Sequence, residues 1–302
     1  MSLAADPSLI DKIAAHMLDA FTFDLSRYLI AASIMFGIIL LFRGWAEARR
    51  IQQRRPSPQD YTREFLSSIR SVFFFSVTTL ATLFLRDAGI ILLDLEQFSL
   101  ALLLAQTAAM ILAHDAYFYW MHRTLHHRRL FRATHLHHHK SRTPSPWTAY
   151  SFSVSEAIFE AAFVPLFLLA ASLFGVAYAG VAVLLFIWIQ IARNVMGHAG
   201  VELHPAGWVD SKWTDWISTT THHDLHHSDG RYNYGFYFTW WDRWMGTEHP
   251  QYKERFRSVA KPIAWPRLGL TGASGSLIAA SAVSISAMGA TAVLASMGAL
   301  GA

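Results

Sequence analysis

Histidines are concentrated in one part of this 302-residue chain. Fourteen of the sixteen lie between His114 and His227. They form three clusters with spacings of three and four residues, which on a helix would place the imidazoles on one face. The clusters are His122 and His126, then His135, His138 and His139, then His223, His226 and His227. Because imidazole is the commonest metal ligand in proteins, these clusters predict a metal site.

The number of clustered histidines predicts two metal ions. A structural or catalytic zinc ion takes three or four protein ligands, and eight histidines exceed that number. The chain contains no cysteine, which excludes thiolate and iron–sulfur ligation. An all-nitrogen, redox-capable site with open positions suits iron, whereas calcium and magnesium prefer oxygen. Zinc stays open, because ligand type alone does not exclude it.

The composition is that of a membrane protein. Hydrophobic residues make up 53% of the chain and charged residues only 15%. The net charge of +4 comes largely from arginines beside apolar runs. These arginines indicate anionic lipid headgroups as neighbours, and they do not indicate a nucleic acid partner.

The apolar runs predict an all-α, integral-membrane helical bundle. A run at about 25–45 is long enough to span a bilayer and predicts an N-terminal anchor. Runs at about 69–93 and 98–113 predict one helical hairpin, and the run at 157–192, too long for one crossing, predicts a second. We therefore expect about four core transmembrane helices, arranged as two hairpins, plus an N-terminal and in one interpretation also a C-terminal helix.

Charge beside the spans predicts the orientation. Arginines follow the first span, and more cations fill 114–146, so the positive-inside rule makes both segments cytoplasmic. All histidine clusters then fall in a cytoplasmic metal-binding cap. We divide the chain into an N-terminal transmembrane region (1–113), a catalytic region that includes the second hairpin (114–267), and an apolar region rich in Ala, Gly and Ser (268–302), which is either a helix or a tail.

Five segments, in this order, resemble the fatty acid hydroxylase and sterol desaturase superfamily of integral-membrane di-iron oxygenases. The segments are His-Arg-Thr-Leu-His at 122–126, His-Leu-His-His-His at 135–139, Arg-Asn-Val-Met-Gly-His at 193–198, His-His-Asp-Leu-His-His at 222–227 and the aromatic stretch that begins Asn-Tyr-Gly-Phe-Tyr at 233. The resemblance runs from about His114 to His249.

The resemblance implies an O2-dependent oxidoreductase with two iron ions, for which zinc can substitute in purified protein. Such an enzyme hydroxylates or desaturates an unactivated C–H bond of a lipid, for example a fatty acyl lipid, a sterol or a carotenoid-like molecule. The bilayer is then a bacterial inner membrane or an endoplasmic reticulum type membrane. The metal ligands carried over are His122, His126, His135, His138, His139, His198, His223, His226 and His227.

Electrons are expected from a separate protein. The chain has no Gly-x-Gly-x-x-Gly fingerprint for a dinucleotide, and nothing in it indicates a fused haem or cysteine-ligated domain. We therefore expect a ferredoxin or a reductase chain as partner.

Several neighbouring residues leave alternatives open. His114 is either a tenth ligand or a residue that orients one, and Asp115, Asn194 and Asp224 either orient imidazoles or serve as caps or solvated polar groups. Histidines one position off the ligand face are expected at the surface or behind the ligands; they are His127, His137 and His222.

Glu156 and Glu160 are unusual at the start of an apolar hairpin, and the sequence favours an ion pair with an arginine over a role near the metals. The aromatic stretch 232–244 indicates either an interfacial belt or a wall of the substrate entrance.

Two other classes of function remain open. A redox-silent, zinc-dependent membrane lipid hydrolase would also bind histidines, but hydrolytic sites usually add a carboxylate. A metal carrier or sensor would need polar groups within the membrane spans, whereas these histidines cluster outside them.

Overall fold

The computed structural model describes residues 9–262. The C-terminal region that the sequence assigns to a helix or a tail, 268–302, lies outside the described residues. Within the described part, the long helices are α1 (Leu9–Leu41), α3 (Pro58–Asp87), α4 (Leu100–Leu125), α6 (Val154–Leu173) and α7 (Gly180–Gly197). All five are long and apolar enough to cross a membrane. The prediction of an all-α membrane bundle is confirmed.

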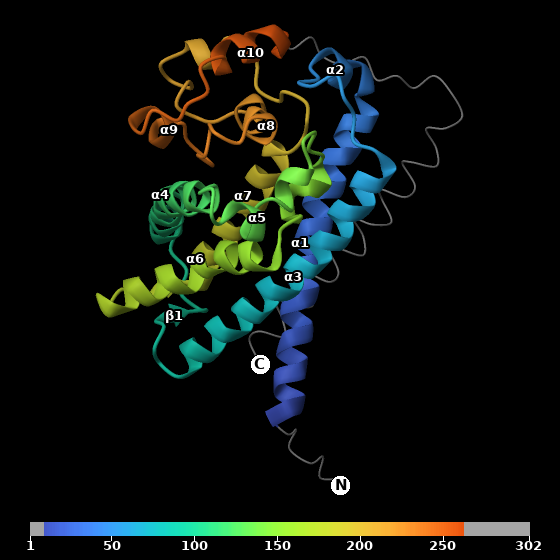
Figure 1. The fold of residues 1–302 in the computed structure, drawn as a ribbon. Helices are drawn as coiled ribbons and strands as arrows, with labels where there is room; N and C mark the ends of the chain where they lie inside the picture. The colour runs from blue at the N-terminus through green and yellow to red at the C-terminus, as the bar shows by residue number, and fades with distance from the viewer. Residues whose placement is uncertain (1–8, 263–302) are drawn as a thin grey trace.

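Short elements make up the rest of the described chain. They are α2 (Arg43–Ala48), α5 (Phe131–Thr134), α8 (Thr220–Ser228), α9 (Trp240–Trp244), α10 (Tyr252–Val259), the 3-10 turns η1 (His138–Lys140), η2 (Pro146–Tyr150) and η3 (Trp208–Asp210), and the strands β1 (Leu93–Asp94) and β2 (Tyr178–Ala179). In Figure 1, α2, α8, α9 and α10 gather at one end of the bundle, which we call the cap, and the start of α1 lies at the opposite end.

The first helix differs from the sequence prediction of a span at 25–45. Helix α1 begins at Leu9, and its apolar part is Ile13–Leu41. The reason is the pair Asp24 and Arg27, which lies inside the helix with Arg27 Nε 2.8 Å from Asp24 Oδ1. Because the two charges neutralise each other and are buried, they do not interrupt the apolar helix.

The two predicted hairpins are joined at the end away from the cap. Strands β1 and β2 pair in parallel, with Leu93 opposite Tyr178. The Gln106 side chain of α4 donates to Ala177 O at 2.9 Å and accepts from Ala179 N at 2.8 Å. These contacts join α4 to the α6–α7 hairpin at the end away from the cap. They thereby help to position the other ends of these helices, which lie beside the cap.

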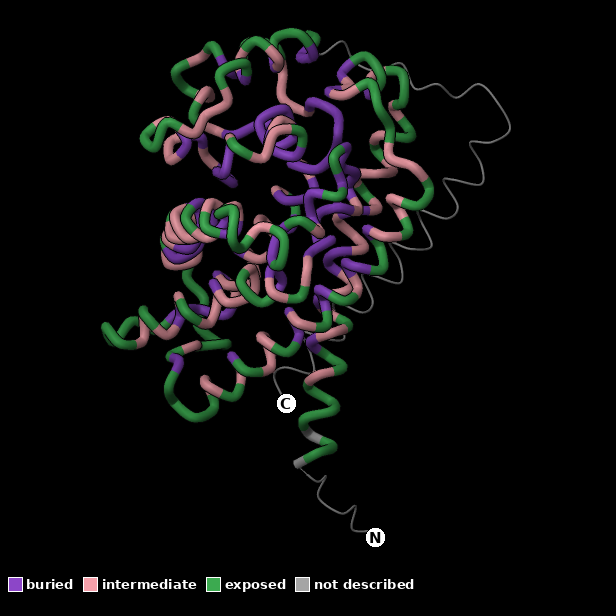
Figure 2. The backbone as a smooth tube through the Cα atoms, in the orientation of Figure 1, coloured by how far each residue is buried: buried purple, intermediate pink, exposed green. Residues whose placement is uncertain are grey.

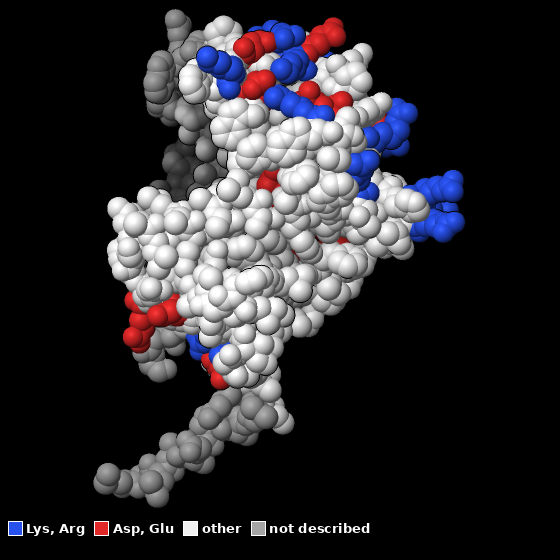
Figure 3. Space-filling view, turned by 90° about the vertical axis from the view of Figure 1, so that its left-hand side faces the viewer, with Lys and Arg blue, Asp and Glu red and all other residues white. Residues whose placement is uncertain are grey.

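The burial and charge patterns separate the cap from the spans. Buried residues concentrate where the cap meets the bundle, and the outer faces of the long helices are exposed, as Figure 2 shows. On the face drawn in Figure 3, charged side chains gather at one end, with a smaller group at the other and a band of few charges between them. An exposed apolar band of this kind is what a helical bundle presents to lipid.

Arg49 joins the N-terminal part of the chain to the cap. Its side chain is fully buried and donates from Nε to Glu202 O at 2.7 Å. It also donates to the carbonyls of His204 and Lys261. One arginine therefore satisfies three backbone acceptors that come from distant segments.

Arg49→Ala should destabilise the cap by about 3 kcal/mol, because buried carbonyls left without a donor cost about 1–3 kcal/mol each. Thermal unfolding of the detergent-solubilised protein measures this as a lower midpoint. Arg54→Ala is the matched control, since Arg54 is exposed. Equal midpoints for both variants would show that Arg49 does not hold the cap.

Candidate metal centre

The histidine clusters meet where three helices end. His122 lies in the last turn of α4, and His126 is its C-cap residue. His198 is the C-cap residue of α7. Helix α8 carries the third cluster, and its N-cap residue is Thr219, whose side chain accepts from His222 N. Chain segments separated by up to about a hundred residues thus converge at the boundary between bundle and cap.

The nine histidines that the sequence predicts as ligands form two groups. In each group, one ligand atom per residue lies within 4.8 Å of all the others. The five-histidine group consists of His122, His126, His135, His139 and His226. The four-histidine group consists of His138, His198, His223 and His227. The groups are adjacent, because the rings of His139 and His227 stack with centroids 5.0 Å apart.

Backbone carbonyls determine which nitrogen points inward. Nδ1 of His198 lies 2.8 Å from Asn194 O, and Nδ1 of His138 lies 3.3 Å from Ser151 O. In the five-histidine group, Nδ1 of His122 lies 3.0 Å from Tyr234 O and Nδ1 of His226 lies 2.7 Å from Tyr232 O. Because a carbonyl only accepts, we assign the proton to each of these Nδ1 atoms, which leaves Nε2 with a free lone pair.

The inward nitrogens face one another at short distances. Nε2 of His198 lies 3.3 Å from that of His138, 3.0 Å from that of His223 and 3.1 Å from that of His227. Where both Nε2 atoms carry lone pairs, as for His138 and His198, no hydrogen bond can form between them. A separation near 3 Å is that of two nitrogens bound at about 2.1 Å to one ion and roughly at a right angle. The donor set therefore fits metal binding.

Burial keeps these imidazoles neutral. It lowers the pKa of His198 to about 4 and that of His139 to about 3. The pKa values of His223, His226 and His227 are also well below the usual range, first because of burial and then because of neighbouring histidines. A metal ion needs deprotonated ligands, so the environment preserves the form that binds.

The second cluster does not lie on one continuous α-helix, contrary to the spacing argument. Helix α5 ends at Thr134, His135 is its C-cap residue, and η1 begins only at His138. The turns still continue, because His139 N donates to His135 O at 3.3 Å. As a result the three histidines diverge, with His135 and His139 in one group and His138 in the other.

Glu156 contacts a histidine of the metal site and not an arginine, contrary to the prediction from the sequence. Its Oε1 lies 2.6 Å from Nδ1 of His135, and both side chains are almost fully buried. No arginine takes part in this contact. A carboxylate behind a ligating histidine fixes the ring and raises its basicity. The N-cap Ser153, whose hydroxyl accepts from Glu156 N at 3.2 Å, starts α6 at the position that brings Glu156 to the site.

The other candidates for orienting the ligands make different contacts. Asp115 accepts from the backbone of Tyr237 at 2.8 Å and from Trp240 Nε1 at 2.7 Å, so it anchors the aromatic stretch. Asn194 acts through its carbonyl on His198, while its side chain donates to Ala149 O. Asp224 accepts from Gln52. His114 belongs to neither group and lies buried among aromatic rings, with Phe163 4.8 Å away between centroids.

The three off-face histidines occupy three environments. His127 is exposed, as the sequence analysis expects. His137 is half-buried, with Nε2 2.7 Å from Ser67 Oγ. His222 is fully buried, and its Nε2 lies 3.4 Å from Asp242 Oδ2. Asp242 in turn accepts from the backbone amides of Tyr234 and Gly235, so that it supports the loop whose carbonyl holds His122.

Gly230 allows the cap to close over the five-histidine group. A Cβ at this position would lie 2.9 Å from Cε1 of His126 and 3.5 Å from Cε1 of His139. Any other residue would push the loop away from the imidazoles. Nothing in the spacing of the histidines indicates this role.

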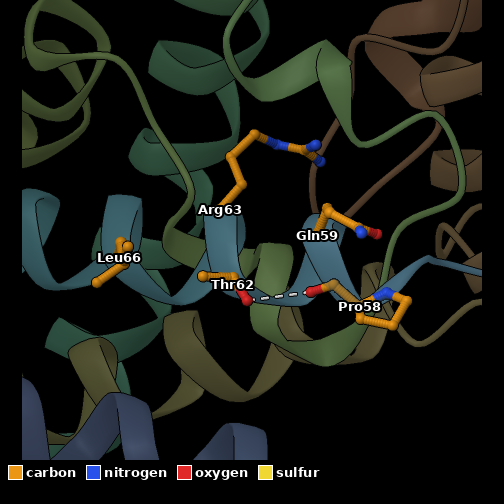
Figure 4. A pocket seen from close by; sticks show the side chains of 5 residues that line it. All are labelled: Pro58, Gln59, Thr62, Arg63 and Leu66. Carbon is orange, nitrogen blue, oxygen red and sulfur yellow. Dashed lines mark hydrogen bonds between the residues drawn. The ribbon is translucent and has the colours of Figure 1, made fainter.

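A pocket on the outside of α3 is separate from the histidines. It has a volume of about 430 Å³ and is lined by Pro58, Gln59, Thr62, Arg63 and Leu66. Figure 4 shows that these side chains come from successive turns at the start of α3. None of them belongs to either histidine group.

Comparisons with known proteins find similarity to one family over the histidine-containing part of the chain. Residues 107–247 match the family model for fatty acid hydroxylase. Lathosterol oxidase of Rattus norvegicus is 28% identical over 195 residues, which cover 63% of this chain and 62% of that protein. A Delta(7)-sterol 5(6)-desaturase of Aspergillus fumigatus is 27% identical over 202 residues, 63% of each chain. Methylsterol monooxygenase 1 of Gallus gallus is 31% identical over 160 residues, 51% of this chain and 50% of that protein.

These matches confirm the resemblance stated from the motifs. Residues 107–247 are similar to the fatty acid hydroxylase family, and the curated relatives include a sterol oxidase and a sterol desaturase. The chain spans about 62% of the length of the first curated relatives that it matches. No solved structure matches it.

Glu156→Gln should weaken metal binding by about 10–100-fold, the usual effect of removing a partner behind a metal ligand. Glutamine keeps an acceptor for His135 but loses the charge. Metal affinity is measured by competition with a chelator of known strength, and the control is Glu160→Gln, one turn further along α6. Equal affinities for both variants would mean that Glu156 serves packing alone.

Proposed function

We propose that the chain is a membrane-bound, O2-dependent oxidoreductase that hydroxylates or desaturates an unactivated C–H bond of a lipid. Two iron ions would be the cofactor and O2 the cosubstrate. The observation that carries this proposal is the convergence of nine imidazoles, in a superfamily domain, into two all-nitrogen groups. Each group would hold one ion, and both lie between the apolar bundle and the cap.

The bound irons would supply the activation of O2 and the abstraction of hydrogen. The chain's own residues hold and shield the centre. Carbonyls of Tyr232, Tyr234, Asn194 and Ser151 orient the imidazoles, and Glu156 orients His135. Because nearly all the ligands are buried, the site excludes water, which protects a reactive oxidant from side reactions.

Aromatic rings face the histidines from the membrane side. The ring of Phe118, one turn before His122 on α4, lies 5.0 Å from it, and Phe152 lies 5.2 Å from His138. Phe152 belongs to a core that also contains side chains of α1, α3, α6 and α7. An apolar approach of this kind favours a lipid, and the names of the relatives make a sterol the first substrate to test.

The composition of the two groups opposes the hydrolase alternative. Among residues 9–262, neither group contains a carboxylate, which hydrolytic zinc sites usually include. A metal carrier is opposed by position, because the groups sit at the ends of the spans and not along them.

Protein expressed in iron-rich medium and purified without oxygen should contain about two irons per chain, one for each group of at least four histidines. His122→Ala removes a ligand from one group and His198→Ala from the other, so each variant should lose about one iron or more and lose O2-dependent lipid oxidation. Elemental analysis and product analysis measure this. His127→Ala is the control.

Zinc that persists in the wild type after growth with excess iron, together with lipid hydrolysis that needs no O2, would support the hydrolase in place of the oxygenase. Iron that is unchanged in both variants would show that the histidine groups do not hold it.

We further propose that the cap faces the cytoplasm. The loops 88–99 and 174–179, at the end away from the cap, contain no Lys or Arg, whereas the cap segments carry many. This asymmetry follows the positive-inside rule.

The orientation can be tested cleanly because the chain has no cysteine of its own. A membrane-impermeant maleimide applied to intact bacterial spheroplasts should label Glu96→Cys, on an exposed loop away from the cap. It should label Arg231→Cys, in the cap, only after the membrane is permeabilised. The reverse pattern would place the metal centre outside.

A further inference from the structure

The segment between the first and second histidine clusters carries an exposed group of cations. We call Arg128, Arg129, Arg132 and Lys140 the basic patch, and all four are exposed. Backbone hydrogen bonds join successive turns of this segment. For example, Leu130 N donates to His127 O at 2.8 Å, and Lys140 N donates to Leu136 O at 3.1 Å. The cations are therefore held together on one short stretch of surface.

No acidic side chain among residues 9–262 forms an ion pair with a cation of the basic patch. Three other arginines of the cap are paired: Arg231 with Asp229 at 2.8 Å, Arg243 with Asp215 at 3.2 Å and Arg257 with Asp210 at 2.6 Å. On the face drawn in Figure 3, Lys and Arg side chains also protrude at one edge with no acidic side chain beside them. Like charges left unpaired at one place repel, and an anionic partner relieves that repulsion.

The basic patch lies directly over the five-histidine group. Phe131, between Arg129 and Arg132, is half-buried, and its ring lies 5.2 Å from that of His126 and 5.6 Å from that of His139. Leu130 and Leu136 are 39% and 36% exposed within the same segment. Between a molecule docked on this surface and the imidazoles of His126 and His139 would thus lie the side chain of Phe131.

We propose that the basic patch is the docking surface for a small acidic protein that carries one electron at a time. The inference rests on the proposed function. Hydroxylation of a C–H bond balances as substrate, O2, two electrons and two protons giving alcohol and water. Desaturation consumes the same two electrons and two protons and gives an alkene and two waters. The sequence shows no cysteine for an iron–sulfur cluster and no dinucleotide fingerprint. In this proposal a reduced carrier protein therefore delivers the electrons.

The chemistry of the surface fits such a carrier. An apolar centre with a charged rim is typical of weak, transient redox interfaces, which bury little area and depend on charge for their association rate. Anionic lipid headgroups would also bind cations, but they give no reason for Phe131 to connect the surface to the five-histidine group. We therefore favour the protein and treat the lipid as an outcome of the test.

The experiment compares two variants with the same charge change. Arg128→Glu with Arg129→Glu reverses two adjacent arginines of the basic patch. The matched control, Arg54→Glu with Arg55→Glu, reverses two adjacent exposed arginines elsewhere in the cap. The full chain is reconstituted in phosphatidylcholine nanodiscs, and the probe is an acidic plant-type [2Fe–2S] ferredoxin. Two quantities are measured: the Kd for ferredoxin as a function of salt, and turnover with ferredoxin or with dithionite and methyl viologen.

We expect the patch variant to bind ferredoxin about tenfold more weakly or worse and to lose most of the salt dependence, because steering by surface charge is screened by salt. Its turnover with dithionite should equal that of the wild type, and the control should match the wild type in every assay. A Kd equal to that of the wild type would overturn the proposal. If, in addition, phosphatidylglycerol raised the thermal unfolding midpoint of the wild type and not that of the patch variant, the patch would be assigned to lipid.

Failure of the proposed function gives a different result. In that case the wild type would show no turnover with either reductant, while the two Kd values would still report on the patch, because binding needs no reaction.

Discussion

The structure depends on one constraint, the approach of unprotonated imidazole nitrogens to about 3 Å from each other. Nε2 of His138 and Nε2 of His198 are 3.3 Å apart, although the Nδ1 proton of each ring is already used on a carbonyl. Two lone pairs at this distance repel, and only a cation between them makes the arrangement favourable. The surrounding protein must therefore hold the rings in place, and most of the contacts described above serve that end.

The bundle meets this constraint by using helix ends. The α4 and α7 helices stop at the level of the site, where their last turns present His122, His126 and His198. The far ends of the same helices are fixed by Gln106 and by the β1–β2 pairing, so that neither helix can slide. The cap then adds α8, and Arg49 ties the cap to the first span. Rigid elements are better supports for a metal site than loops alone.

The histidine spacing predicted eight of the nine residues that the structure brings together, because a spacing of three or four residues survives in any tight succession of turns, whereas His198 came from the family resemblance alone. This is why His135, His138 and His139 could be identified even though they do not lie on a regular helix. Of the groups that orient the rings, only Asn194 was among the candidates from the sequence, and it acts through its backbone carbonyl. Glu156 reaches His135 only because α6 packs there, and the carbonyls of Ser151 and Tyr234 carry no side-chain signature. The apolar runs also predicted the spans. The first helix begins earlier than predicted, because Asp24 and Arg27 neutralise each other as a buried ion pair inside it.

The two histidine groups differ in what surrounds them, and this difference separates two routes to the site. The five-histidine group reaches the surface through His126 and Phe131, beneath the basic patch. The four-histidine group is fully enclosed and meets the apolar core at Phe152, while Phe118 approaches His122 from the same membrane side. A lipid that enters between the spans and a protein that docks on the cap would then use opposite sides of the centre. Because His139 stacks on His227, electrons that enter at one group would have a packed route to the other in the proposed function, and neither partner would have to leave before the other binds.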